Sequence, residues 1–157
     1  MKFKISYFYH VRNFKPHQVP ISTAKYDPKW FHNNKGEGHV WVDKNGVING
    51  LRKKELAPND NCNGLCVGPK VCMAEPSNCL FLNCYYDQLH GTDFDKLINE
   101  LEGMVKVYSE RNPRYNGEQE LECILLVYET PDNPCSERGH LVKWFKENGY
   151  ELEEFVK

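Results

Sequence analysis

Aromatic, β-branched and apolar residues gather into short runs that predict strands. Residues 4–11 and 19–22 are rich in such side chains and are separated by a turn at Pro16, so both segments are expected to be strands. The run LECILLVYE, residues 121–129, is apolar at almost every position, which is typical of a strand buried on both faces of a parallel sheet. The C-terminal ELEEFV predicts a last short strand.

Helical periodicity and one turn motif predict the other regular elements. Apolar residues at three- and four-residue spacing predict a long helix that opens at Thr92, with Asp95 in the position of a capping box. Its apolar face comprises Phe94, Leu97, Ile98, Leu101, Met104, Val105 and Tyr108. A second helix is expected from about Ser136. Asn45-Gly46, inside residues 40–51, predicts a β-hairpin with a tight turn, whose two central residues need positive φ.

The order of these elements predicts the fold class. Strand, long helix, buried strand, loop, helix and strand describe a single compact α/β domain of Rossmann-like type over residues 1–157. The hairpin and a cysteine-rich segment, residues 59–84, are then insertions into this domain. The cysteine-rich segment shows no clear period and is punctuated by Gly, Pro and Asn, so we expect a loop that needs something else to order it.

Composition and charge narrow the choice of partners. The chain has 157 residues, 40% of them hydrophobic, and a formal net charge of -2, which is a globular composition without an overall positive field. Nucleic acid binding is then expected only through a local patch, of which NGLRKKEL is the densest example. No apolar run is long enough to predict a membrane span. MKFKISYFYHVRNF lacks the pattern of a signal peptide, so we expect a cytoplasmic protein.

Five of the seven cysteines lie within residues 62–84, at the spacing C-x3-C-x5-C-x6-C-x4-C. Thiols in the cytoplasm are normally kept reduced, which favours metal binding over disulfides as the reason for this cluster. A structural zinc ion takes four thiolate or imidazole ligands, often from loops whose glycines let the backbone wrap the ion. We predict a zinc site formed by Cys62, Cys66, Cys72 and Cys79.

The same cysteine cluster is compatible with two alternatives to zinc. An iron-sulfur cluster uses the same thiolates, and the spacing does not separate it from zinc. Plain buried thiols or disulfides are the second alternative. The fifth cysteine, Cys84, falls in FLNCYY, which is expected to form a short helix with this residue on or near its packed face.

The loop TPDNPCSERGH joins the buried strand to the last helix, at the edge where open α/β sheets bind ligands. Cys135 is expected at the helix N-terminus, which favours a thiolate and any bound anion. Arg138 adds a cation, His140 a proton carrier, and Glu129 a carboxylate at the strand end. We therefore predict Cys135, Arg138 and Glu129 as catalytic residues and His140 as a ligand-binding residue.

A structural interpretation of this loop uses the same residues. Pro134 then sets the start of the helix, and Cys135 is a small core residue. Arg138 then pairs with Glu129 or Glu137. The loop also lacks the C-x5-R spacing of cysteine phosphatases, because only two residues separate Cys135 from Arg138.

Further ligand-binding candidates lie where the first strands end. Arg12 and Asn13 follow the first expected strand and Ser22 ends the second, so parallel neighbours would bring them to one crevice. We predict these three as ligand-binding residues. Some aromatic residues could stack on nucleotides, although core packing explains most aromatics in strands: Tyr7, Tyr9 and Trp30.

Several segments together carry a family resemblance. After a first strand followed by VRN come VPISTAKYDPKWF, VDKNGVINGLRKKELAP, CNGLCVGPKVC, PSNCLFLNCYYDQL, DFDKLINELE and LVYETPDNPCSERGHLVKWF. In order and spacing, from about Ser6 to Glu154, they are similar to the bacterial and phage family catalogued as domain of unknown function 488. The resemblance implies a compact α/β fold with a cysteine-bearing insertion and marks ETPDNPCSER as the signature loop. Members usually carry a tighter Cys-His-Arg run there, from which this chain departs.

Two functions of different classes follow from these observations. The first is a metal-binding α/β protein that binds or acts on a nucleotide-like or other anionic small molecule at the loop before the last helix. The second is a zinc-stabilised interaction module for nucleic acid or a protein partner, as in a phage or bacterial accessory protein. The sequence leaves open whether the chain is an enzyme.

Overall fold

The structure is a computed structural model that describes residues 1–66 and 79–157. The strands of these residues are β1 (Lys2–Tyr7), β2 (Gln18–Ser22), β3 (Trp41–Val42), β4 (Ile48–Asn49), β5 (Glu122–Val127) and β6 (Leu152–Glu154). The helices are α1 (Asp60–Asn63), α3 (Leu80–His90), α4 (Phe94–Glu110) and α5 (Arg138–Glu147), with the 3-10 helices η1 (Phe8–Asn13), η2 (Lys29–His32) and η3 (Lys54–Leu56). Within the described ranges, no helix combines the length and the apolar character that crossing a membrane requires.

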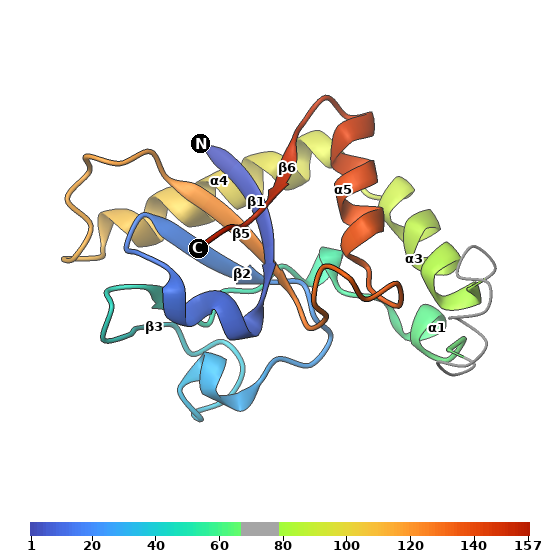
Figure 1. Cartoon of the computed structure of the whole chain (residues 1–157), viewed down its shortest axis with the longest axis horizontal. Coiled ribbons are helices and arrows are strands. Elements are labelled where there is room, and N and C mark those ends of the chain that lie inside the picture. Colours follow the sequence, from blue (N-terminus) through green and yellow to red (C-terminus); the bar gives the residue numbers. More distant parts are fainter. Residues whose placement is uncertain (67–78) are drawn as a thin grey trace.

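A four-stranded sheet with the order β2-β5-β1-β6 lies at the centre of the described part of the chain (Figure 1). Its pairings are parallel: β1 pairs with β5 and β6, and β5 pairs with β2. All residues of β5 are buried, because this strand has a neighbour on each side and protein on each face. The structure therefore confirms the α/β class and the prediction of a fully buried strand in a parallel sheet.

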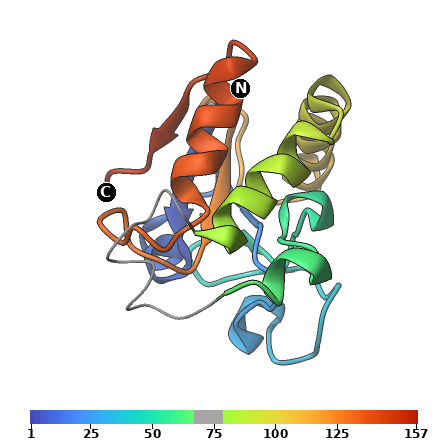
Figure 2. The same ribbon diagram turned by 90° about the vertical axis from the view of Figure 1, so that its right-hand side faces the viewer.

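Side chains of β5 alternate between two hydrophobic cores, one on each face of the sheet. Cys123, Leu125 and Val127 pack with residues of α3, α4 and α5. Ile124 and Leu126 pack with residues of η1 and η2. In Figure 1, α4 passes behind β1 and β5, and Figure 2 shows α3 beside α5. Each large apolar side chain that is fully buried contributes roughly 1.5–3 kcal/mol, so both layers depend on this strand.

The long helix α4 keeps its predicted apolar face but starts differently from the prediction. Its buried residues are Phe94, Leu97, Ile98, Leu101, Val105 and Ser109. Asp93, not Thr92, is the N-cap, and its carboxylate accepts a hydrogen bond from the Lys96 N–H at 3.1 Å. The Thr92 hydroxyl donates to the Gln88 carbonyl, so this residue closes α3 instead. A carboxylate also interacts favourably with the positive end of the helix dipole, which explains the preference for Asp93.

Two other predicted boundaries were wrong. The first strand ends at Tyr7 rather than Val11, because the chain turns into η1 at Phe8. The last helix begins at Arg138 rather than near Ser136. The Ser136 hydroxyl accepts a hydrogen bond from the Arg138 N–H at 3.1 Å, which holds the preceding residues in a turn.

The predicted hairpin is present as β3 and β4, but its turn is longer than the predicted two-residue type. Of the two central residues Asn45 and Gly46, Gly46 alone has a positive φ, +80°. The Asp43 carboxylate accepts hydrogen bonds from the N–H groups of Asn45 and Val47, at 2.8 and 3.0 Å. Because the Asp43 side chain accepts the hydrogen bonds of these backbone N–H groups, the turn does not need a second residue with positive φ.

Candidate functional site

The carboxyl ends of β2 and β5 border a pocket of about 330 Å³. Parallel sheets bind ligands at this edge, because the loops that leave the strands there form a crevice. Thr23, Lys25 and Tyr26 line the pocket after β2, Pro58 and Asn63 line it around α1, and Glu129 and Glu137 line it at the two ends of the loop before α5.

Two carboxyl groups meet in this pocket. Glu129 follows the end of β5, Glu137 directly precedes α5, and a hydrogen bond joins their side chains. Burial, and then the neighbouring Glu129 carboxylate, raise the pKa of Glu137 to about 8. A carboxyl group with such a pKa keeps its proton at neutral pH and can donate it. Glu137 therefore brings a proton into the pocket beside a second carboxyl group.

Arg138 fixes the loop that carries the pair. Its guanidinium forms an ion pair with the Glu154 carboxylate of β6, and its Nη2 donates to the Glu129 carbonyl at 2.7 Å. Arg138 is only 6% exposed, although it starts a surface helix. Burial raises the pKa of Glu154, against the opposing effect of the Arg138 charge. Arg138 thus joins β5, β6 and α5. Its ion-pair partner is Glu154 rather than Glu129 or Glu137, the partners expected in the structural interpretation of this loop, and its charge is balanced within the fold.

The segment after β2 forms the opposite wall of the pocket. The Thr23 N–H and hydroxyl both donate to the Leu126 carbonyl, at 3.0 and 2.8 Å, which continues the contact between β2 and β5. The Tyr128 hydroxyl donates to the Tyr26 carbonyl. Burial, and then the Asp27 and Glu129 carboxylates, raise the pKa of Tyr128, so it stays a neutral hydrogen-bond donor. The wall is therefore held to the same strand end that carries Glu129.

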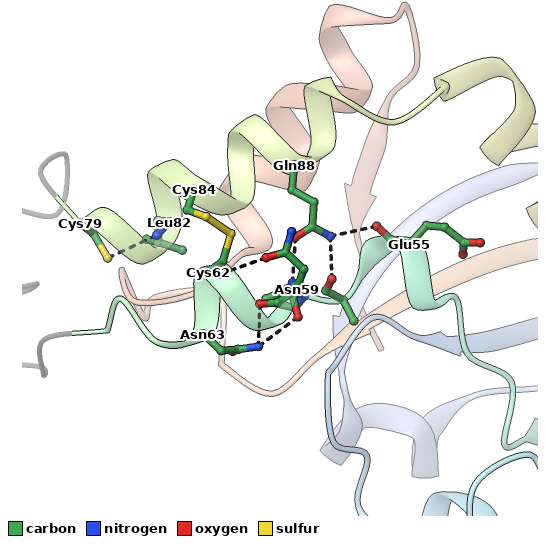
Figure 3. The surroundings of a disulfide bond; sticks show 10 residues. Glu55, Asn59, Cys62, Asn63, Cys79, Leu82, Cys84 and Gln88 are labelled. Carbon is green, nitrogen blue, oxygen red and sulfur yellow. Dashed lines mark hydrogen bonds between the residues drawn. A yellow bond between two sulfur atoms is a disulfide. The ribbon is translucent and has the colours of Figure 1, made fainter.

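The third wall, around α1, is fastened to α3 by a disulfide between Cys62 and Cys84 (Figure 3). Gln88 of α3 adds three hydrogen bonds: its Nε2 donates to the carbonyls of Ala57 and Glu55, at 2.7 and 3.3 Å, and its Oε1 accepts from the Asn59 N–H at 2.9 Å. Together these contacts hold the short helix α1, four residues long, beside the pocket. A helix of this length does not form without such support.

The disulfide changes the interpretation of the cysteine cluster. Cys84, which is not a member of the predicted zinc quartet, is bonded to Cys62, which is. Cys66 is exposed, and the Cys79 sulfur accepts a hydrogen bond from the Leu82 N–H at the start of α3. Cys72 lies outside the described residues, and in residues 1–66 and 79–157 no group of three or more His, Cys, Asp or Glu could hold a metal ion. The zinc or iron-sulfur site stays a prediction, and it requires a reduced Cys62.

Arg138 and His140 line a further pocket of about 440 Å³, together with Lys143 and other residues, whereas Cys135 does not line it. Cys135 lies three residues before α5 rather than in its first turn, and it packs against Cys79 and Leu82. Burial, and then the Lys143 charge, lower the pKa of His140. The ion pair of Arg138 and the displaced Cys135 make this pocket a weaker anion site than the sequence indicates.

The ligand-binding residues predicted from β1 and β2 are not in the same pocket as Glu129. Arg12 and Asn13 line a pocket of about 990 Å³ beside η1. Ser22 is buried and donates its hydroxyl to Asp27, whose carboxylate also lies 2.7 Å from the His32 Nε2. The structure thus separates the predicted residues because β1 turns into η1 instead of running on to the sheet edge.

Sequence reasoning missed the role of Glu137. The sequence offers Glu137 only as one of two expected ion-pair partners of Arg138. The structure shows that its side chain makes no capping hydrogen bond and meets Glu129 instead. The nine-residue stretch from Glu129 to Glu137 carries no sequence signal that its two ends meet.

Comparisons with protein-family models, with curated proteins and with solved structures find no match to the chain.

Replacing Glu137 by Gln should change how stability depends on pH. Because the pKa of Glu137 is about 8 in the folded chain and lower in the unfolded chain, the unfolded chain loses this proton first as pH rises. The free energy of unfolding of the natural chain should therefore fall between pH 5 and pH 8. In Glu137→Gln this fall should be smaller by on the order of 2 kcal/mol, measured by urea unfolding. The exposed Glu151→Gln variant should behave as the natural chain, and parallel curves for all three chains would contradict the assignment.

Cysteine variants should show whether the Cys62–Cys84 disulfide or a metal site stabilises the cysteine-rich segment. The disulfide closes a sequence separation of 22 residues, so Cys84→Ser should lower the free energy of unfolding by about 3 kcal/mol, and reductant should remove the difference from the natural chain. Cys66→Ser should have little effect. If zinc holds the quartet, Cys66→Ser and a chelator lower the melting temperature while Cys84→Ser does not.

Proposed function

We propose that this chain is an acid–base enzyme that binds and acts on a nucleotide-like or other anionic small molecule in the pocket bounded by Glu129 and Glu137. The observation that carries the proposal is the hydrogen-bonded carboxyl pair in a pocket at the carboxyl edge of a parallel sheet. Sites at this edge are typical of Rossmann-like folds, and we propose that classification as well. The signature loop of domain of unknown function 488, ETPDNPCSER here, would carry both carboxyl groups.

The two carboxyl groups take opposite roles in a hydrolysis. Glu129 accepts a proton from water as the water oxygen bonds to the substrate. Glu137 gives its proton to the leaving atom as the substrate bond breaks. The proton on Glu129 then returns to Glu137 through the hydrogen bond between them. The products together gain one water molecule, and the pair is restored.

Basic residues near the pair support an anionic substrate. Lys25 lines the pocket of the pair and forms an ion pair with the exposed Asp60. It also lines an adjoining pocket of about 330 Å³ that contains Lys29 and Arg52, of which Arg52 is paired with Glu37. The acidic residues of the adjoining pocket, Asp27 and Glu37, are paired with cationic or histidine side chains. A phosphate or carboxylate group beside the lysines would leave the uncharged end of the substrate next to Glu129 and Glu137.

The alternative, an interaction module, gains less support. In its basic run NGLRKKEL, two of the positive charges are balanced by ion pairs, because Arg52 pairs with Glu37 and Lys53 pairs with Glu100. We keep the zinc-bound loop, residues 59–84, as part of the proposal with a structural role. A metal ion there would order the segment that contributes Asn63 to the pocket.

Substitution of either carboxyl group tests the proposal. A panel of nucleoside monophosphates and sugar phosphates is incubated with the natural chain, and products are followed by proton NMR. We expect turnover of at least one compound and a loss of about 100-fold or more in Glu129→Gln and in Glu137→Gln, because each removes one proton-transfer step. Glu151→Gln should keep full turnover. No turnover of the panel, or full turnover by both pair variants, would refute the proposed function.

A further inference from the structure

A pocket of about 990 Å³ lies among residues of η1, η2 and the β3–β4 hairpin. It shares no lining residue with the pocket of Glu129 and Glu137. We propose that this pocket of η1, η2 and the hairpin binds a nucleobase, carried either by a free nucleotide or by a single-stranded nucleic acid. The inference does not rest on the proposed function, because its residues and its test are separate.

Aromatic rings supply walls on which a base can stack. Tyr9, Trp30 and Trp41 line the pocket, and the first two are 57% and 42% exposed. The Trp41 indole N–H donates to the Phe31 carbonyl at 3.0 Å, and Trp30 packs edge-on against Phe8. These contacts hold the rings in place, so stacking a base costs little side-chain entropy and contributes roughly 1–3 kcal/mol.

Two buried amide atoms in the pocket residues need hydrogen-bond partners. Asn49 is 1% exposed, and its Nδ2 donates to the Asp43 carboxylate at 3.0 Å and to the Val47 carbonyl at 3.2 Å. Its Oδ1 and the Nδ2 of Asn13 are buried, and among the described residues neither has a partner. A buried polar atom without a partner costs about 1–3 kcal/mol, which a ligand can recover.

The chemistry of these two atoms favours a base over a phosphate. Asn49 Oδ1 needs a donor and Asn13 Nδ2 needs an acceptor. The edges of nucleobases present both kinds of group, whereas an ionised phosphate presents acceptors only. The residues that line the pocket therefore combine aromatic rings with an amide donor and an amide acceptor, the two kinds of group by which proteins recognise unpaired bases.

Cationic side chains at the pocket suit the phosphate that accompanies a base. The Arg12 guanidinium lies 3.9 Å from the centre of the Tyr9 ring, and its Nε donates to the Tyr9 carbonyl at 3.2 Å. Lys44 also lines the pocket. The Asp43 carboxylate is occupied by the hairpin turn and by Asn49. This local positive charge favours a nucleotide over a neutral sugar, which aromatic and amide groups also bind.

Tryptophan fluorescence tests the proposal directly, because Trp30 and Trp41 lie in the pocket while Trp144 of α5 is buried in the core. The probes are the four nucleoside monophosphates, ribose 5-phosphate and a ten-nucleotide single strand of DNA. We expect at least one nucleotide or the strand to change the emission, with ribose 5-phosphate inactive. Similar affinities for strand and nucleotide identify a nucleotide site. Tighter, strongly salt-dependent strand binding identifies a single-stranded nucleic acid.

Calorimetric binding measurements on variants test whether the probe binds in this pocket. Trp30→Ala should weaken binding of the best probe about tenfold, whereas Trp30→Phe stays within about threefold because it keeps a stacking ring. Asn13→Ala should also weaken binding, and Lys106→Ala on the exposed side of α4 should not. Unchanged binding in Trp30→Ala, equal binding of ribose 5-phosphate, or no binding at all would overturn the proposal.

Discussion

Arg138 holds the carboxyl edge of the sheet together. Its guanidinium binds the Glu154 carboxylate of β6 and the carbonyl of Glu129 after β5, and the residue itself begins α5. The guanidinium is buried and the Glu154 side chain is 35% exposed, so removing this carboxylate would leave a buried charge without its ion-pair partner, which destabilises the fold. Glu137 directly precedes Arg138, so the same contacts bring its carboxyl group next to that of Glu129.

The remaining walls of the pocket depend on contacts between segments that are far apart in the sequence. The segment after β2 is held by Thr23 and Tyr26, and the segment around α1 is held by Gln88 and the Cys62–Cys84 disulfide. A disulfide and a bound metal ion would serve the same physical purpose here, since each constrains a polar segment that buries little apolar surface. The cysteines therefore stabilise the pocket indirectly, by constraining the segment around α1 that forms one of its walls.

The sequence predicts the parts of this fold that have a strong local pattern. Continuous apolar character identifies β5, and helical spacing identifies the buried face of α4. It does not predict the end of β1 at Tyr7, because aromatic residues suit strands and 3-10 helices alike when both are packed. Glu129 was predicted from its place at a strand end, whereas Glu137 was missed because its partner is set by tertiary packing. The pairing of Cys62 with Cys84 was missed for the same reason.

The raised pKa of Glu137 beside the Glu129 carboxyl group is the property on which the proposed chemistry depends. It is tested most directly by NMR titration of side-chain carboxyl carbons in protein labelled with ¹³C-glutamate, with the Glu137 signal assigned from its absence in Glu137→Gln. The structure predicts that this signal titrates with a pKa of about 8 and that Glu129→Gln lowers the value. A Glu137 signal that titrates like an exposed glutamate, unaffected by Glu129→Gln, would contradict the account.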